Sequence, residues 1–555
     1  MPHYTLPYHD GTAWENVARM AKKYPRQTAC EFMGTRISFG QFARMVRQCA
    51  NALIKSGVKP GDRVTLCLPN CPHAVILFYG VNLAGGVANM IHPLSAEEEI
   101  AQFLTTADSR LAFTLDLFYD KFRAVAPRFP GLRIVVASAA DFLRPLTRLG
   151  YALTEGRKIK LPPLNRRTVR WKAWFSTGRG KLPEFPVRTA QDPAAILYTG
   201  GTTGIAKGAV LSNFNLNALA LQILTTNPMF TPGDKMLAIL PLFHGFGLGI
   251  GVHAMLSSGG ACVLVPRFTP ASFAKLLVKT KCAFLAGVPS LYEAMLHQPV
   301  LEKADLSHLK GVYCGGDVLP VELKAKIDAF LTERGSPVHI REGYGATECS
   351  SASCLTPTHG ERPGSIGLPL PDMAYKIVRP DTAESLPPNH PGEICISGPT
   401  VMLGYPDHPE ENALALRRHP DGRVWLHTGD LGSMDPDGYV RFIQRIKRII
   451  ITNGYNVYPS RLELVLNSHP KVRQSCVIGV PDPRRMHRIK AFVVLQPGEV
   501  PSESLKQELT DWCRTRIARY ALPREIEFRD SLPMTRMAKV DYRALELEEQ
   551  AKRSE

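Results

Sequence analysis

Several features that define common protein classes are missing from this 555-residue sequence. Its twelve cysteines include no Cys-x-x-Cys pair, so the usual spacing of a zinc or redox site is absent. We expect reduced, mostly buried thiols, as in a cytoplasmic protein. The first residues, MPHYTLPYHDG, lack a basic segment followed by an apolar one, which argues against a secretory signal.

Charged residues are absent between Met236 and Pro266, a stretch long enough to cross a bilayer. Two prolines, two histidines and six glycines interrupt this stretch. Such a composition favours buried strands and a short helix over a lipid-facing helix, so we predict no transmembrane segment here.

Acidic residues are nearly missing from residues 142–181, where eleven lysines and arginines face one acid, Glu155. The resulting charge of +10 is more than half of the net +17 of the chain. Leucines and aromatic residues, including Trp171 and Trp174, are interleaved with the cations. We interpret this basic insertion as a site of peripheral contact with anionic lipids, the alternative being a solvated surface insertion. No DNA or RNA motif accompanies it, which disfavours nucleic-acid binding.

Apolar, strand-like runs alternate with amphipathic helical patterns through the first 440 residues. This alternation predicts an α/β N-terminal domain over residues 1–445, with layered, largely parallel sheets covered by helices. After Arg445 the pattern restarts in a shorter segment. Residues 446–555 are enough for a small α+β C-terminal domain.

A glycine- and threonine-rich loop, YTGGTTGIAK, runs from Tyr198 to Lys207 directly after an apolar run. Glycines let the backbone approach an anion closely, while backbone N–H groups, hydroxyls and the lysine donate to it. The loop is not a Walker loop, because Ile205 and Ala206 separate Gly204 from Lys207 and Gly208 replaces the serine or threonine. It predicts a different kind of phosphate site.

Four further motifs follow in order: YGATE (344–348), WLHTGD (425–430), RIKRIIITNGYNVYPSRLE (445–463) and LPMTRMAK (532–539). Together with the loop they resemble the adenylate-forming, AMP-binding superfamily, which includes acyl-CoA synthetases, peptide-synthetase adenylation domains and luciferases. The block GDRVTLCLPNCPHAVILFYGVNLAGG extends the resemblance toward the N-terminus. The YTGG form of the loop looks like that of bacterial long-chain fatty-acid–CoA ligases.

The resemblance implies an ATP site built from most of these motifs. Thr347 would meet the α-phosphate, Glu348 would bind Mg²⁺, and Tyr344 would stack on adenine. Asp430 and Arg445 would hydrogen-bond the ribose. The remaining residues expected to bind ATP, through its phosphates or beside adenine, are Thr199, Gly201, Thr202, Thr203, Gly204, Lys207, Gly315, Gly316 and Asp317.

The C-terminal motifs imply the catalytic group and a moving domain. Lys539 is the catalytic lysine by resemblance, a cation that would reach both the substrate carboxylate and the α-phosphate. Lys447 would be the hinge about which the C-terminal domain turns between half-reactions. Gly454 would then line the channel for the pantetheine arm of CoA.

The acyl pocket is expected around His244, in PLFHGFG, and the segment 287–296. No charged residue stands out in FHGFG or GVPS as a partner for a substrate amino group. We expect Gly245, Gly247 and Gly249 to leave room for an apolar tail. The sequence therefore predicts a cytoplasmic fatty acid:CoA ligase for medium or long chains, in contact with the inner membrane surface, that uses Mg²⁺, ATP and CoA. An aryl-CoA ligase, a fatty acyl-AMP ligase and a β-lactone synthetase are the alternatives within the superfamily, and a non-catalytic membrane or nucleic-acid binding protein is the alternative outside it.

Overall fold

The computed structural model describes residues 4–159, 165, 167–199, 207–452, 455–482, 486–535 and 539–554. The chain forms two compact units: unit 1 comprises Met1–Tyr375 and Ile396–Leu426, and unit 2 comprises Lys376–Cys395 and His427–Glu555. The predicted boundary at residue 445 is the expected hinge between two moving domains, not the edge of a compact unit, and it stays a prediction.

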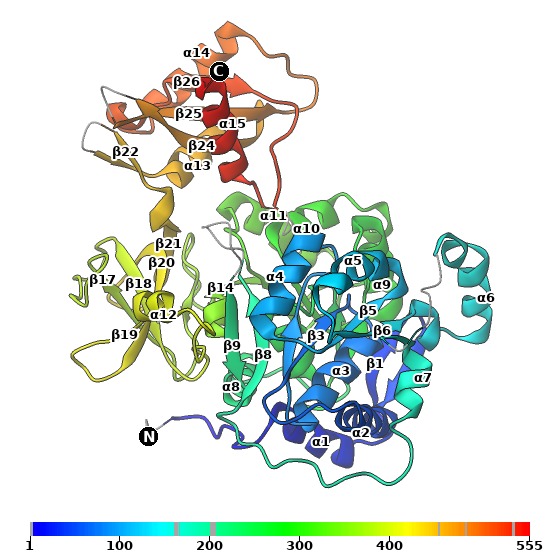
Figure 1. The fold of residues 1–555 in the computed structure, drawn as a ribbon. Coiled ribbons are helices and arrows are strands. Elements are labelled where there is room, and N and C mark those ends of the chain that lie inside the picture. Colours follow the sequence, from blue (N-terminus) through cyan, green and yellow to red (C-terminus); the bar gives the residue numbers. More distant parts are fainter. Residues whose placement is uncertain are drawn as a thin grey trace. The chain divides into compact units, whose positions relative to one another are not determined.

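The first sheet of unit 1 has seven strands in the order β7-β6-β5-β3-β4-β8-β9, all parallel except β9. Figure 1 shows α4 and α5 lying over this sheet, where Phe103 and Phe122 are buried in its core. The elements are β3 (Arg63–Cys67), β4 (Val87–Met90), β5 (Leu111–Leu115), β6 (Arg133–Ala137), β7 (Thr168–Arg170), β8 (Pro193–Tyr198), β9 (Gly208–Ser212), α3 (Pro72–Leu83), α4 (Glu97–Ala107), α5 (Tyr119–Val125), α6 (Pro145–Leu153) and α7 (Trp171–Ser176).

The second sheet has nine strands in the order β16-β15-β14-β13-β12-β10-β11-β1-β2, and the six from β14 to β1 run parallel. The strands are β1 (Thr28–Phe32), β2 (Thr35–Ser38), β10 (Lys235–Ala238), β11 (Ala261–Leu264), β12 (Phe284–Gly287), β13 (Gly311–Cys314), β14 (Ile340–Ala346), β15 (Ser351–Leu355) and β16 (Leu368–Pro369). The helices are α1 (Ala13–Lys23), α2 (Phe39–Lys55), α8 (Asn213–Thr225), the π-helix η5 (Phe246–Ala254), α9 (Pro270–Thr280), α10 (Pro289–Leu296) and α11 (Val321–Glu333).

An inner layer of buried helices joins the two sheets of unit 1. α3 is buried on all sides, as expected of a helix that is apolar all round, and α8 contacts both β9 and β15. His253 of η5 lies in this layer with ring nitrogens 3.0 Å from Tyr79 Oη and 2.9 Å from Asn217 Oδ1, and burial lowers its pKa to about 3. The buried polar groups are thus hydrogen-bonded, as a stable interior requires.

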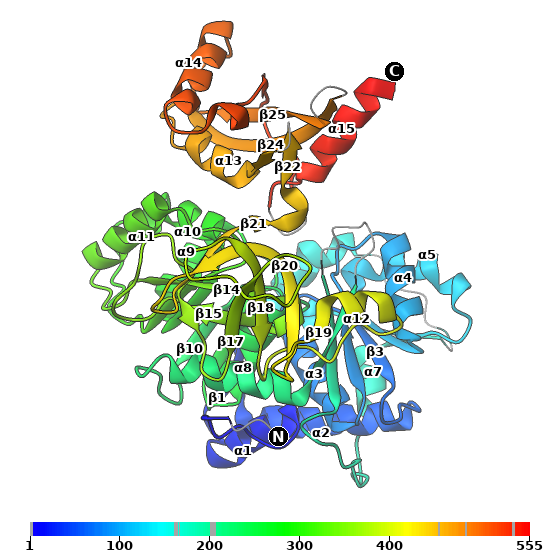
Figure 2. The same cartoon turned by 90° about the vertical axis from the view of Figure 1, so that its left-hand side faces the viewer.

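Unit 2 contains a three-stranded sheet, β24-β25-β26, in which β25 is antiparallel to β24 and parallel to β26. Alternate residues of β24 and β25 pack on α13 and α14 on one face and on α15 on the other, as Figure 2 shows. Its elements are β21 (Val440–Arg445), η8 (Ile446–Arg448), β22 (Ile450–Thr452), β23 (Tyr455–Val457), α13 (Pro459–Asn467), β24 (Val472–Asp482), β25 (Met486–Leu495), α14 (Glu503–Arg514), β26 (Glu525–Phe528) and α15 (Tyr542–Ser554).

The boundary between the units runs through three strands, β17 (Ala374–Val378), β18 (Gly392–Ser397) and β20 (Val424–Met434). In unit 1, the start of β20 pairs with β19 (Leu416–Arg418), which follows α12 (Pro409–Ala415). In unit 2, the rest of β20 pairs with β21.

The structure confirms the predicted fold class, an α/β region with layered, largely parallel sheets and a small α+β region. All twelve cysteines are buried. The charge-free stretch 236–266 forms most of β10, then η5 and β11, so the prediction of buried strands and a helix is confirmed. Among the described residues no helix is long and apolar enough to cross a membrane.

Candidate active site

Several predicted site residues of unit 1 follow the carboxyl ends of neighbouring parallel strands. β14, β13, β12 and β10 are adjacent and parallel, so the segments that follow them emerge at one edge of the sheet. Ligands of open α/β sheets bind at such an edge. The segments are Thr347–Glu348 after β14, Gly315–Asp317 after β13, Val288 onward after β12 and the chain to His244 after β10.

The loop after β13 requires glycine and is anchored by a buried carboxyl group. Gly316 has a φ of 82°, a conformation that side chains rarely adopt, and a Cβ on Gly315 would lie 3.0 Å from the Gly343 carbonyl oxygen. The Leu319 N–H donates to Glu342 Oε1 across 3.1 Å. Asp317 is exposed at the tip. Nothing in the sequence singled out Glu342, because an isolated glutamate in a strand belongs to no recognisable motif.

Glu342 gives a pH-dependent prediction. Burial raises its pKa from the ordinary value near 4.5 to about 7. The folded protein therefore holds this proton longer than the unfolded chain, and the associated stability is lost as the pH rises between these values. Glu342→Gln keeps an acceptor for Leu319 without a buried charge, so we expect it to be more stable than wild type at pH 8 by about 2 kcal/mol and by much less at pH 5. Chemical denaturation at both pH values, with Glu333→Gln on an exposed side chain as control, measures this; an equal difference at both would contradict it.

Glu348 and Thr347 lie in the short helix η7 (Thr347–Cys349), after an irregularity of β14 at Tyr344 and Gly345. A Cβ on Gly345 would lie 1.5 Å from the Ser351 carbonyl oxygen, so only glycine fits. Thr347 is buried, and Glu348 and Tyr344 are half-buried. Glu348 Oε1 accepts a 2.7 Å hydrogen bond from the Tyr405 hydroxyl.

Lys207 lies beside the same tyrosine. Its Nζ is 5.6 Å from the centre of the Tyr405 ring and 3.4 Å from Glu411 Oε1. The Thr199 N–H donates to the Lys207 carbonyl across 2.9 Å, which closes the ends of the predicted phosphate loop. Gly201, Thr202, Thr203 and Gly204 lie outside the described residues. Tyr405 thus links two predicted site residues, although sequence reasoning missed it because it belongs to none of the five motifs.

Removing the Tyr405 hydroxyl tests this link. A hydrogen bond to a charged group contributes about 1.5–3 kcal/mol, so Tyr405→Phe should free the Glu348 carboxylate and lower kcat/KM for ATP by roughly tenfold or more. The Mg²⁺ concentration needed for half-maximal rate should rise as well. Tyr4→Phe, on a ring 36% exposed, is the matched control. Unchanged ATP and Mg²⁺ dependence in Tyr405→Phe would show that the bond does not position Glu348.

In unit 2, Asp430 and Arg445 are directly opposite each other on β20 and β21. Arg445 Nε lies 2.8 Å from Asp430 Oδ1; the aspartate is buried, and half of the arginine side chain is exposed. Thr428 Oγ1 accepts from the Asp430 N–H across 3.1 Å and donates to the Ile394 carbonyl across 2.7 Å. The two residues predicted to share one sugar therefore do lie together.

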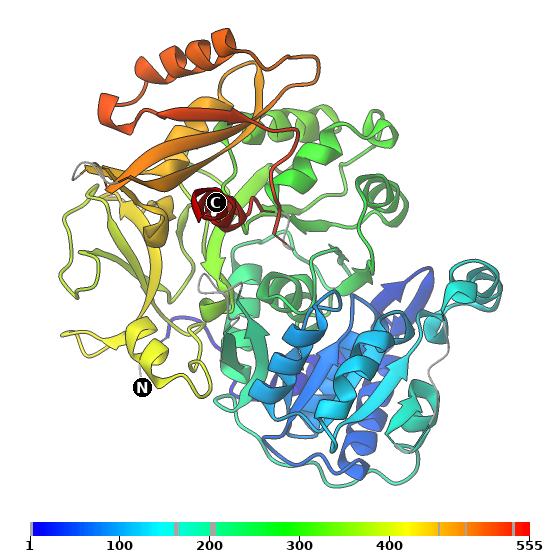
Figure 3. The ribbon, with the colours of Figure 1, turned by 45° about the horizontal axis from the view of Figure 1, so that its top comes forward.

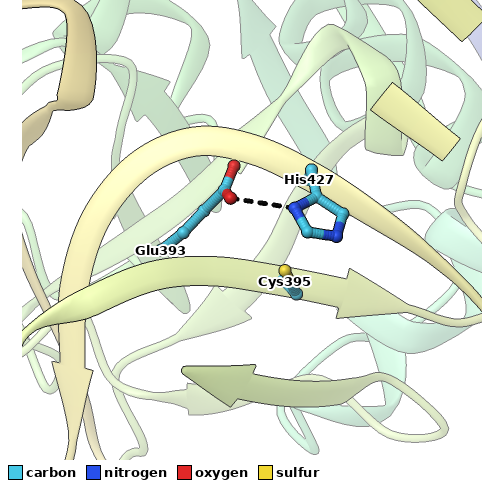
Figure 4. Close-up of side chains that lie close together, drawn as sticks. All are labelled: Glu393, Cys395 and His427. Atoms are coloured by element: carbon cyan, nitrogen blue, oxygen red, sulfur yellow. Dashed lines mark hydrogen bonds and ion pairs between the residues drawn. The ribbon is translucent and has the colours of Figure 1, made fainter. Parts of the chain in front are cut away.

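A buried cluster supports the turn before Asp430 (Figure 4). His427 Nδ1 is 2.8 Å from Glu393 Oε2, and the Gly429 N–H donates to Glu393 Oε1 across 3.0 Å. Among the described residues, Glu393, Cys395 and His427 also form the one group whose ligand atoms are close enough to hold a metal ion, within 4.8 Å. Because both Glu393 oxygens already have partners, we interpret the cluster as support for the turn.

Lys539 and Lys447 are both exposed residues of unit 2. The Lys539 N–H donates to Thr535 Oγ1 across 3.2 Å, and the Lys539 carbonyl accepts from the Thr535 N–H across 2.7 Å. Lys447 lies in η8, next to Arg448, whose Nη2 is 2.6 Å from Glu463 Oε1. Gly454 lies outside the described residues.

The expectation that three glycines leave room for an acyl tail is wrong. A Cβ would lie 2.3 Å from the Ser350 carbonyl oxygen at Gly245, 2.1 Å from that of Pro241 at Gly247, and 2.6 Å from Leu219 Cδ2 at Gly249. These positions are glycine because backbone and Leu219 already fill the space. His244 is half-buried, and its Nδ1 accepts from the Phe246 N–H across 3.3 Å at the start of η5. π-Helices are rare and frequent at functional sites.

Comparison with known proteins gives matches over almost the whole chain. The family described as AMP-binding enzyme matches residues 17–406, and the AMP-binding enzyme C-terminal domain matches residues 461–539. A long-chain-fatty-acid–CoA ligase of Bacillus subtilis is 34% identical over 554 residues, 99% of this chain and 96% of the relative. A feruloyl-CoA synthase of Amycolatopsis is 32% identical over 524 residues, 94% and 96% of the two chains. The crystal structure of the anthranilate CoA ligase AuaEII in complex with anthranoyl-AMP has a TM-score of 0.82 at 25% identity and covers 99% of each chain.

Proposed function

The chain belongs to the AMP-binding enzyme family, and we propose that it joins a medium- or long-chain fatty acid to CoA. Its broader class is that of the adenylate-forming acid–thiol ligases, for which ATP and CoA are the co-substrates. One observation supports the proposal most strongly. A relative named as a long-chain-fatty-acid–CoA ligase matches 99% of this chain, and the predicted catalytic residues Thr347, Glu348 and Lys539 are all present.

The proposed reaction has two steps. A carboxylate oxygen of the fatty acid attacks the α-phosphorus of ATP, and the bond to the β-phosphate oxygen breaks, which releases pyrophosphate and leaves an acyl-adenylate. The CoA sulfur, having lost its proton, then attacks the acyl carbon, and AMP leaves with the oxygen that joined the two. Both steps shift negative charge near the α-phosphate, so fixed cations should accelerate them.

In unit 1, we assign the phosphates of ATP to Lys207, Thr199 and Thr347, together with the loop residues Gly201, Thr202, Thr203 and Gly204. Adenine would stack on Tyr344 beside Gly315, Gly316 and Asp317. The half-buried Glu348 carboxylate is a hard oxygen ligand and suits Mg²⁺, which would neutralise phosphate charge when bound. Tyr405 holds that carboxylate in place.

In unit 2, we assign the ribose hydroxyls to Asp430 and Arg445, and the carboxylate and α-phosphate to Lys539. The proposed division of labour is an N-terminal domain of residues 1–445 and a mobile C-terminal domain of residues 446–555 that turns about Lys447. Gly454 would line the path of CoA after that turn.

Two observations bear on which class of acid is the substrate. The segment after β12 becomes α10, whose Leu291, Tyr292 and Met295 are buried in an apolar cluster while its one charged residue, Glu293, is exposed. The buried side chains of this segment thus carry no charge, which agrees with the expectation that the acid has no amino group. An aryl-CoA ligase is the second candidate, because a feruloyl-CoA synthase matches almost as well as the fatty-acid ligase.

Pyrophosphate release with saturated fatty acids of increasing length, and with ferulate, tests the proposed substrate class. Each buried methylene contributes about 0.8 kcal/mol, so kcat/KM should rise by roughly fourfold per methylene until the pocket is filled. The kcat/KM of the longest accepted fatty acid should exceed that of ferulate by orders of magnitude. A higher kcat/KM for ferulate would replace the fatty-acid proposal with the aryl one.

A further inference from the structure

One helix of the basic insertion presents an apolar stripe to solvent. Leu146, Leu149 and Leu153 of α6 are 86%, 60% and 57% exposed. With about 100° of rotation per residue, the three side chains fall within about 60° of one another on the helix. Figures 1 and 3 show α6 at the margin of unit 1, away from both of its sheets.

The other side of α6 is tied to the body of unit 1. Arg148 donates to the carbonyls of Ala140 and Leu143 across 3.0 and 3.2 Å. Between them, Asp141 lies 3.2 Å from the buried His73 and 3.5 Å from Lys172 of α7. The helix is therefore held by polar contacts at its base, and the leucines are not needed to attach it.

The tryptophans predicted to reach a membrane do not do so. Trp171 and Trp174 are each 3% exposed, and Trp174 Nε1 donates to Ser56 Oγ across 2.9 Å. The Trp174 ring meets Phe113 edge to face at 4.7 Å. These rings complete the core beneath α7, because an indole buried with its N–H satisfied is more stable there than in water. The membrane prediction is thus wrong for Trp171 and Trp174, and the most exposed apolar side chains of the insertion are the leucines of α6.

Cations surround this stripe in the sequence and remain accessible. The segment 142–181 has a net charge of +10. Its described and exposed basic residues are Arg144, Arg148, Arg157, Arg167, Arg170, Lys172, Arg179 and Lys181. An exposed apolar stripe on a short helix, set among cations, matches the interface of an anionic bilayer in both polarity and charge.

We propose that α6 is a membrane-docking helix, which inserts Leu146, Leu149 and Leu153 into the headgroup boundary of an anionic phospholipid bilayer while the neighbouring arginines and lysines bind its phosphates. One short helix supplies a weak, reversible anchor, so binding depends on both the leucines and the charge.

Co-sedimentation with vesicles of equal parts phosphatidylglycerol and phosphatidylethanolamine tests the proposal. The variant Leu146→Gln/Leu149→Gln/Leu153→Gln should bind at least tenfold more weakly than the full-length wild type. The matched control, Leu117→Gln/Leu464→Gln/Leu547→Gln, changes three leucines that are 55%, 52% and 64% exposed elsewhere and should bind as wild type does. Both variants should keep wild-type pyrophosphate release with octanoate, a soluble acid, which verifies folding without using the membrane.

Charge is tested separately with phosphatidylcholine vesicles and with Arg144→Gln/Arg157→Gln. We expect little binding to the neutral vesicles and, for the arginine variant, a weaker dependence on salt. Undiminished binding of the α6 leucine variant, or equal binding of wild type to neutral and anionic vesicles, would overturn the proposal. So would a dimer that the leucine variant converts to a monomer in light scattering, since the stripe would then be a protein interface.

Discussion

Replacing Lys539 by alanine is expected to lower the rate of acyl-adenylate formation by roughly a hundredfold to a thousandfold, the usual effect of removing a group that stabilises charge in a transition state. The side chain is exposed in unit 2, and its backbone is held to Thr535 by two hydrogen bonds. Loss of the ammonium group should therefore leave the fold intact. The second half-reaction, measured from preformed acyl-AMP and CoA, should keep most of its rate.

The measurement is single-turnover formation of acyl-AMP in the absence of CoA. Lys506→Ala removes the same charge from α14, where the lysine is paired with the exposed Glu503 in a contact that contributes little to stability, and serves as the control. Equal loss in both half-reactions would indicate a structural role for Lys539. No loss in either half-reaction would show that the catalytic assignment of Lys539 is wrong. It would then favour the alternative hypothesis of a non-catalytic binding protein.

Replacing Lys490 by methionine should destabilise unit 2 by about 3 kcal/mol, because it removes the buried cation that three glutamates share and leaves the buried Glu549 to the half-exposed Lys552. Lys490 is 3% exposed on β25, and its Nζ lies 2.5 Å from Glu525, 2.7 Å from Glu527 and 2.9 Å from Glu549. Burial by itself would lower the pKa of this lysine, but hydrogen bonds to the three glutamates raise it. The cluster joins β25, β26 and α15, so its loss should affect the region that also carries Lys539.

Thermal unfolding followed by calorimetry measures this effect, together with the temperature at which adenylation stops. Lys552→Met is the matched control, because Lys552 binds the same Glu549 across 2.8 Å but is half-exposed, and the change there should cost less than about 1 kcal/mol. Glu549→Gln in the Lys490→Met background should restore part of the stability. Equal effects of the two lysine changes would contradict the account of a buried, charge-dependent cluster.

The sequence predicted the parts of the fold and site that depend on local patterns. Alternating apolar runs predicted the layered α/β region, and ordered motifs placed Asp430 and Arg445 on one site, where the β20–β21 register does bring them together. Patterns of this kind act within a few residues or recur across a family, so a single chain reveals them.

The remainder depends on contacts between distant segments. Tyr405 binds Glu348 from 57 residues away, and Glu342 acquires its raised pKa only through burial under the loop after β13. The sequence predicts open space beside Gly245, Gly247 and Gly249, although backbone atoms and the Leu219 side chain fill it. Trp171 and Trp174 were predicted at a membrane surface, although Ser56 and Phe113 receive Trp174 in the interior. Composition records which side chains are present, but only the tertiary fold decides which of them meet water.

The most direct test of the central claim is chromatographic analysis of the products formed from ATP, Mg²⁺ and a mixture of fatty, aromatic and 3-hydroxy acids, with and without CoA. We expect medium- or long-chain acyl-CoA, formed only when CoA is present, together with AMP and pyrophosphate. Aryl-CoA as the main thioester, or acyl-AMP or a lactone with no thioester in either reaction, would contradict it.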